Sequence, residues 1–191
     1  MEMNKIEYLI IHNEGADNGF NAVNEWHRQQ GFTKSSLGFY VGYQDYMEKN
    51  GTIKKARLDT DEGCHTVRFN KNSKAICLRG NLDLSQPTTT QRHELRLWIQ
   101  ENMKKYNVPA DKVKAHRYFK NTTTCCGKNL PDSELREMAN YTQPEVPIEA
   151  TESVKIGLME RLIVLLREMI DQLQNRLKMG GNKDSRCEGG R

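Results

Sequence analysis

Apolar residues follow two alternating patterns along the first 140 positions of the chain. Short apolar runs predict buried strands at 6–12, 75–80 and 113–116. Apolar positions three or four residues apart predict helices at 21–30, 88–106 and 132–140. Between them, Asn50-Gly51 favours a hairpin turn joining strands at 40–47 and 52–57. This order predicts an α/β fold with a mixed central β-sheet flanked by helices and a site at the strand ends.

Local signals mark the ends of two of these helices. Asn21 is a predicted N-cap of the first helix, and Gly31 is its stop signal. Thr88 and Gln91 have the spacing of a capping box, which predicts the start of the second helix. That helix has one apolar face, formed by Leu95, Trp98, Ile99, Met103 and Tyr106.

The pattern changes after the predicted domain at 1–140. Residues 141–154 contain two prolines, are acidic and lack periodicity, which predicts an extended linker. Residues 155–178 predict an amphipathic helix whose apolar positions recur in steps of three and four, as in a coiled coil. Residues 179–191 are Gly-rich and charged, which predicts a disordered tail. The helical stripe consists of Ile156, Met159, Ile163, Leu166, Ile170, Leu173 and Leu177.

A helix with so wide an apolar face requires a partner surface. It could pair with copies of itself, fold back onto the preceding domain, or lie on a membrane. Its heptad spacing favours a homo-oligomer. The flanking charges have both signs, which argues against a cationic membrane helix, at Glu160, Arg161, Arg167, Glu168 and Asp171.

Composition is typical of a soluble protein with a modest core. The 191 residues suit one domain with an appendage, and mean hydropathy is −0.81. A formal charge of +4 fits ordinary solubility or steering toward an anionic polymer. Lys and Arg do not cluster with interleaved aromatic residues, so we expect no nucleic-acid partner.

The N-terminal segment lacks the basic and apolar regions of a secretion signal. No stretch approaches the roughly 20 apolar residues that a membrane span needs. Five cysteines without regular spacing fit a reducing compartment better than a disulfide framework. These features predict a cytoplasmic protein.

Three residues form a candidate metal site. His12 and His116 each end a predicted strand, and Cys125 follows nine positions after the second. Two imidazoles and a thiolate would leave one zinc coordination position open, as in catalytic rather than structural sites. Taken singly, the histidines could be hydrogen-bonded residues at strand ends, and the cysteine could be a small buried side chain.

Six short motifs, in order between about Ile6 and Pro131, resemble the zinc-dependent N-acetylmuramoyl-L-alanine amidases. This is the type 2 family shared by phage endolysins and peptidoglycan recognition proteins. The motifs are Leu-Ile-Ile-His12; Glu25-Trp-His-Arg-Gln-Gln-Gly31-Phe; Val-Gly42-Tyr43 leading to Asn-Gly51-Thr-Ile; Gly63-Cys-His65-Thr; Asn72-Ser-Lys-Ala-Ile-Cys77-Leu-Arg-Gly80-Asn; and Ala-His116-Arg through Cys125-Cys-Gly127-Lys-Asn.

The resemblance implies a Zn2+ ion held by His12, His116 and Cys125. It also implies that Tyr43 hydrogen-bonds the attacking water or the oxyanion, with Thr123 nearby. A tyrosine packing across strands is the alternative for Tyr43. The resemblance places His65 in a segment that lines the substrate groove, and the alternative is an exposed loop histidine.

The sequence departs from the family pattern near these residues. Aligning Gly127-Lys-Asn with the family pattern makes Cys125 the ligand and puts Cys126 where proline is usual, and zinc binding by Cys126 is the alternative. Thr123 stands where many relatives carry lysine, and Lys120 or Lys128 could take over that role. Cys77 stands where some relatives carry a glutamate base, and Gln44 stands where a histidine often follows the tyrosine.

The implied activity is hydrolysis of the amide between N-acetylmuramic acid and L-alanine in bacterial peptidoglycan. A bacteriophage or prophage endolysin that lyses the wall after its release from the cytoplasm fits best. The alternative is a peptidoglycan-binding module that keeps the fold without turnover. A third alternative is a structural zinc protein that assembles through its C-terminal helix.

Overall fold

The computed structural model describes residues 5–142, together with 159–160, 162–164, 166–167 and 169–170. The chain divides into two units, Met1–Thr142 and Gln143–Arg191. In the first unit a five-stranded sheet has the order β3-β2-β4-β1-β5. Its strands are β1 (Tyr8–Asn13), β2 (Asp45–Met47), β3 (Ile53–Lys55), β4 (Ser73–Leu78) and β5 (Val113–Ala115). All neighbouring pairs are parallel except β2 and β3, so the predicted mixed sheet and its hairpin are confirmed.

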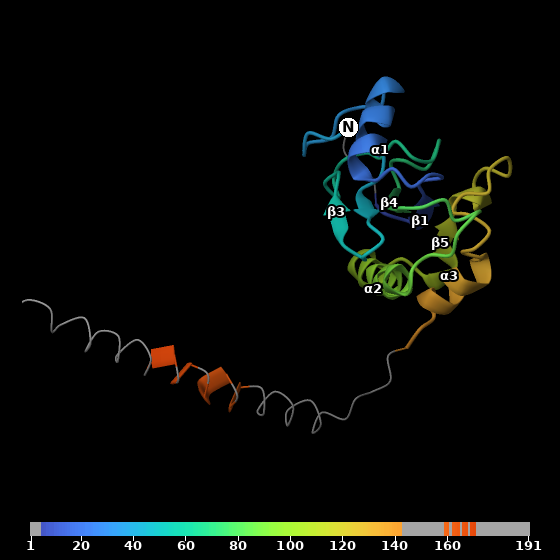
Figure 1. Ribbon diagram of the computed structural model, residues 1–191. Coiled ribbons are helices and arrows are strands. Elements are labelled where there is room, and N and C mark those ends of the chain that lie inside the picture. The colour runs from blue at the N-terminus through green and yellow to red at the C-terminus, as the bar shows by residue number, and fades with distance from the viewer. Residues whose placement is uncertain (1–4, 143–158, 161, 165, 168, 171–191) are drawn as a thin grey trace, which may run out of the picture. The chain divides into compact units, whose positions relative to one another are not determined.

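Helices cover both faces of this sheet. The helix α1 (Phe20–Gln29) lies on one side, and α2 (Thr89–Tyr106) and α3 (Asp132–Ala139) lie on the other (Figure 1). Two short 3₁₀ helices, η1 (Ala110–Lys112) and η2 (His116–Tyr118), flank β5. The elements lie close to their predicted positions, whereas the hairpin strands are shorter than expected. The predicted capping box at Thr88 and Gln91 is confirmed.

The prediction of Asn21 as an N-cap is wrong. The helix begins at Phe20, and its N-cap is Gly19, which makes no side-chain cap hydrogen bond. The carboxylate of Glu14 instead fixes the chain that leads into the helix, because its Oε1 accepts hydrogen bonds from the backbone N–H groups of Asn18 and Gly19. The helix therefore starts after a turn held by Glu14 from the loop after β1, and it has no side-chain cap of its own.

Alternation along the strands separates two hydrophobic clusters. On β1, Leu9 and Ile11 belong to the larger cluster, which includes α2 and α3 residues. On β4, Ile76 belongs to this larger cluster, whereas Cys77 belongs to the smaller cluster with α1 residues. Since side chains alternate between faces in a strand, His12 points to the face opposite Ile11, which is the face covered by α1.

A buried polar network lies between the sheet and α2. The Nζ of Lys74 is 3.3 Å from Asp45 and 3.0 Å from Asp59. The indole N–H of Trp98 donates to Asp45 at 2.9 Å, and the side chain of Asn102 accepts from Lys74 at 2.8 Å. These pairings satisfy charged groups that would be costly to bury alone.

The predicted linker and tail lie largely or wholly outside the described residues. The described positions between 159 and 170 are helical and their side chains are exposed. They include the apolar residues Met159, Leu162, Ile163, Val164, Leu166, Met169 and Ile170. None of the helices within the described ranges combines the length and apolar character needed to cross a bilayer.

Candidate metal centre

Two adjacent parallel strands bring the two histidines together. His12 lies near the end of β1 and is 2% exposed. β5 pairs with β1 through Ala115, and His116 follows as the first residue of η2. Because parallel strands end at the same edge of the sheet, the two imidazole rings approach to 4.5 Å between centroids.

Arg117 holds the loop that carries the third residue, Cys125. The Arg117 guanidinium donates to the carbonyl oxygens of Gly127 and Leu130 at 2.9 Å each. Its backbone N–H donates to the carbonyl of Cys125 at 2.6 Å. Gly127 has a φ of 90°, and a Cβ there would lie 2.5 Å from the Cβ of Leu82, so a larger residue would displace this loop.

The fold brings His12, His116 and Cys125 into one group. One ligand atom from each lies within 4.8 Å of the others. The Nδ1 of His12 is 3.6 Å from the Sγ of Cys125, and the backbone N–H of Asn13 donates to that sulfur at 3.4 Å. Two nitrogens and one sulfur in this arrangement are suitable ligands for zinc, and the donor set leaves a fourth tetrahedral position for another molecule.

Burial sets the protonation of these groups. Desolvation, followed by the charges of neighbouring histidines, lowers the pKa of His12 well below its usual value. Desolvation and the charge of Lys120 lower the pKa of His116. Burial raises the pKa of the Cys125 thiol to about 12. The imidazoles are therefore neutral and able to coordinate a cation, whereas the thiol must lose its proton on binding one.

Other predicted site residues surround this group at different distances. The Tyr43 ring centroid is 4.9 Å from that of His12, and the His65 centroid is 5.2 Å from it. Thr123 lies in the cysteine loop, where its Oγ1 accepts the backbone N–H of Cys125 at 3.2 Å. Burial raises the pKa of Tyr43 well above its usual value, which keeps the phenol protonated.

The residues that the sequence left as alternatives occupy different environments. Cys126 is fully buried in the larger hydrophobic cluster, and Cys77 is fully buried in the smaller cluster.

Lys120 is exposed and close enough to His116 to lower its pKa, as described above. Lys128 is also exposed, and its backbone N–H donates to Asp83 at 2.9 Å. The Gln44 side chain links the carbonyl of Asp61 to the backbone N–H of Ala75, so it has a structural role.

Sequence reasoning missed two side chains next to the centre. His27, on α1, stacks on Phe32 and accepts the Gly42 backbone N–H at 3.3 Å, which supports the turn before Tyr43. Thr66 is 2% exposed and places its Oγ1 3.4 Å from the Nε2 of His12. Both lie inside motifs that carried the resemblance, and this was the signal that could have identified them.

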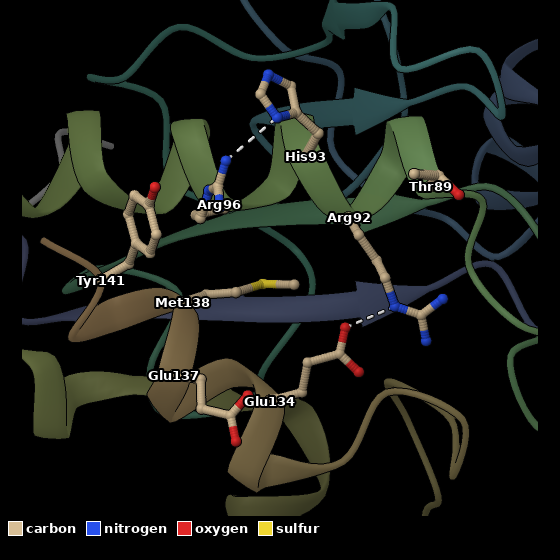
Figure 2. A pocket seen from close by; sticks show the side chains of 8 residues that line it. All are labelled: Thr89, Arg92, His93, Arg96, Glu134, Glu137, Met138 and Tyr141. Atoms are coloured by element: carbon tan, nitrogen blue, oxygen red, sulfur yellow. Dashed lines mark hydrogen bonds and ion pairs between the residues drawn. The ribbon is translucent and has the colours of Figure 1, made fainter. Parts of the chain in front are cut away.

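A separate hollow of about 400 Å³ lies between α2 and α3. Figure 2 shows Arg92 paired with Glu134 and Arg96 beside Tyr141. The hollow is lined by arginine and glutamate side chains, and none of the three candidate metal ligands lines it. This hollow is therefore distinct from the metal centre.

Comparisons with known proteins agree with this geometry. The profile of the N-acetylmuramoyl-L-alanine amidase family matches residues 2–128. The chain belongs to this family.

Curated relatives include phage endolysins. The endolysin of Escherichia phage T7 is 31% identical over 65 residues, which are 34% of this chain and 39% of that protein. The endolysin of Klebsiella phage KP32 is 30% identical over 67 residues, which are 35% of this chain and 40% of that protein. The matches therefore span well under half the length of these relatives.

Solved structures extend the likeness over more than two thirds of this chain. The N-acetylmuramoyl-L-alanine amidase LysC from Clostridium intestinale has a TM-score of 0.63 and 27% identity, covering 72% of this chain and 87% of its own. Drosophila PGRP-LB has a TM-score of 0.61 and 21% identity, covering 76% and 89% respectively. The second likeness shows a shared fold alone.

Proposed function

We propose that this protein is a zinc-dependent N-acetylmuramoyl-L-alanine amidase. It would cleave the amide between N-acetylmuramic acid and L-alanine in bacterial peptidoglycan. The observation that carries the proposal is the convergence of His12, His116 and Cys125, whose ligand atoms lie within 4.8 Å of one another. Family membership supplies the substrate class.

The three residues would each donate one atom to the ion. Neutral imidazoles from His12 and His116 contribute nitrogens, and Cys125 contributes a sulfur that already accepts the Asn13 backbone N–H. A bound zinc would supply a Lewis acid for the scissile carbonyl and an activated water near neutral pH.

Tyr43 would act on the scissile carbonyl oxygen as it gains charge. Because burial raises its pKa, the phenol keeps its proton and can donate a hydrogen bond at neutral pH. Thr123 would assist from the cysteine loop, since its oxygen accepts the Cys125 N–H and leaves its own proton available. His65, whose ring centroid is 5.2 Å from that of His12, would contact the bound muropeptide.

The wider biological role proposed is that of a phage or prophage endolysin. Similarity to the phage endolysins supports it. Such an enzyme would be made in the cytoplasm and reach the wall after release. Residues 1–140 would form the catalytic domain, 141–154 a linker, 155–178 a helix that joins copies of the chain, and 179–191 a disordered tail.

Purified bacterial cell wall tests this function against binding without turnover. An amidase releases new L-alanine amino termini, which dinitrophenylation followed by hydrolysis identifies. A binding module would sediment with the wall and release none. Thr123, where relatives often carry lysine, and the unusual Cys125-Cys126 pair are the features that favour the binding alternative.

A further inference from the structure

A hydrogen-bonded chain leads away from the His12 nitrogen that does not face Cys125. The Oγ1 of Thr66 is 3.4 Å from the Nε2 of His12 and 3.0 Å from the Nδ1 of His65. Thr66 is 2% exposed, so water does not compete freely for its hydroxyl. One hydroxyl therefore bridges two imidazole rings.

The directions of these hydrogen bonds follow from the ligand geometry. The Nδ1 of His12 faces Cys125, so a cation there requires the His12 proton to be on Nε2. The Nε2–H of His12 is then a donor, so the Oγ1 of Thr66 must be the acceptor in this hydrogen bond. The single hydroxyl proton of Thr66 is then donated to His65 Nδ1. A neutral His65 consequently carries its own proton on Nε2.

The backbone around Thr66 is fixed by one side chain. The Oδ1 of Asn70 accepts the backbone N–H groups of His65 at 2.9 Å and of Thr66 at 2.8 Å. Gly63 leaves room for the His65 ring, because a Cβ there would lie 2.4 Å from its Cδ2. His65 and Thr66 therefore have little freedom to move away from His12.

We propose that Thr66 is a positioning residue that fixes the ring orientation and tautomer of His12, and that His65 and Asn70 hold Thr66 in place. The inference rests on the proposed metal site and extends it beyond the three ligands. Metal-bound histidines usually donate their second N–H to a partner, and loss of that partner typically weakens metal binding about 10–100-fold. Here a neutral hydroxyl, itself oriented by a second histidine, is the partner.

Zinc affinity of the full chain tests the proposal by competition with a chromophoric chelator. Thr66→Val removes the hydroxyl at nearly constant volume and should weaken zinc binding about 10–100-fold. Thr66→Ser keeps the hydroxyl and should bind zinc close to the wild-type affinity. Thr33→Val is the matched control, because its hydroxyl contacts Cys64 at 3.2 Å and neither imidazole.

A second readout separates positioning from general stability. Nitrogen-15 NMR of the zinc-loaded wild type should show His12 protonated on Nε2, with an unprotonated Nδ1 on His65. Because this spectrum needs no variant, it tests the proposed tautomers of His12 and His65 even if Thr66→Val fails to fold. A proton on His65 Nδ1 would overturn the proposed chain.

The affinity results distinguish this inference from the proposed function. Wild-type protein that binds zinc, with Thr66→Val binding equally tightly, would overturn the positioning role alone. Equal weakening in Thr66→Ser and Thr66→Val would also overturn it, since the hydroxyl would then be irrelevant. Wild-type protein that binds no zinc would refute both the metal site and the inference.

Discussion

The Nδ1 of His12 lies 3.6 Å from the Sγ of Cys125, although 113 positions separate the two residues. Two independent features produce this proximity. β1 delivers His12 to the edge of the sheet, and Arg117 fastens the cysteine loop over the same edge through carbonyl hydrogen bonds. The site is therefore assembled by the fold from segments that lie far apart in the sequence.

Zinc content should depend on each of the three ligands. His12→Ala, His116→Ala and Cys125→Ser should each lose zinc and activity by more than the ~10–100-fold that loss of a supporting residue causes. Metal analysis of the purified variants checks this. Cys126→Ala is the control and should retain zinc, because Cys126 lies in the hydrophobic core. Loss of zinc from Cys126→Ala with retention in Cys125→Ser would reverse the assignment.

Turnover should depend on the hydroxyl of Tyr43. Tyr43→Phe should lower kcat by ~10²–10³, as expected when one oxyanion donor is lost, and should leave zinc content and melting temperature near wild type. Tyr40→Phe is the matched control, since it removes a phenol from a half-exposed residue in the same segment. Wild-type kcat in Tyr43→Phe would show that another group stabilises the oxyanion.

Stability should fall in acid through the polar network around Asp59. Burial alone would raise the pKa of Asp59, but hydrogen bonds from Lys105, Lys55, Tyr106 and Lys74 hold it well below its usual value. A carboxylate with a depressed pKa stabilises the folded state above the unfolded pKa of ~3.9, and this contribution is lost as pH falls below that value.

Asp59→Asn should therefore lower the free energy of unfolding at pH 7 by about 1.5–3 kcal/mol, the usual range for a hydrogen bond to a charged group. The difference from wild type should shrink below about pH 4. Denaturant unfolding at several pH values measures it. A difference that is independent of pH would mean that the ionisation of Asp59 does not contribute.

Self-association should require the C-terminal helix. The described positions between 159 and 170 expose apolar side chains, and heptad spacing favours pairing with a second copy. The full chain should form oligomers in light scattering, and Ile163→Lys with Ile170→Lys should give monomers, because ammonium groups would be buried unpaired. Truncation after Tyr141 should yield a monomer that still cleaves peptidoglycan. A monomeric full chain would contradict the prediction.

Much of the fold could be predicted because local patterns determined its elements. The apolar run ending at His12, the Asn50-Gly51 turn and the Thr88–Gln91 capping box each depend on neighbouring residues alone. The start of the first helix could not be predicted in this way, because its N-cap is Gly19 and Glu14 holds the chain just before the helix. The polar network was also missed, since Lys74 and Asp45 meet only when β2 and β4 pair.

The sequence suggested the three candidate ligands, whereas their supporting residues required the structure. Arg117 could be seen as part of a motif, but its contacts with the cysteine loop span as many as 13 positions. Thr66 meets His12 across 54 positions, so the motif Gly63–Thr66 could draw attention to the threonine but could not identify His12 as its partner. Contacts of this kind follow from loop conformation, which no periodicity specifies.

The release of L-alanine amino termini from purified peptidoglycan, measured with and without zinc, tests the central claim most directly. We predict release by the wild type, loss of release after removal of metal by a chelator, and recovery when zinc is restored to the same sample. The His12→Ala variant should not recover with zinc. Release that persists in the demonstrably metal-free protein, or wall binding without release in the zinc-loaded protein, would contradict the account.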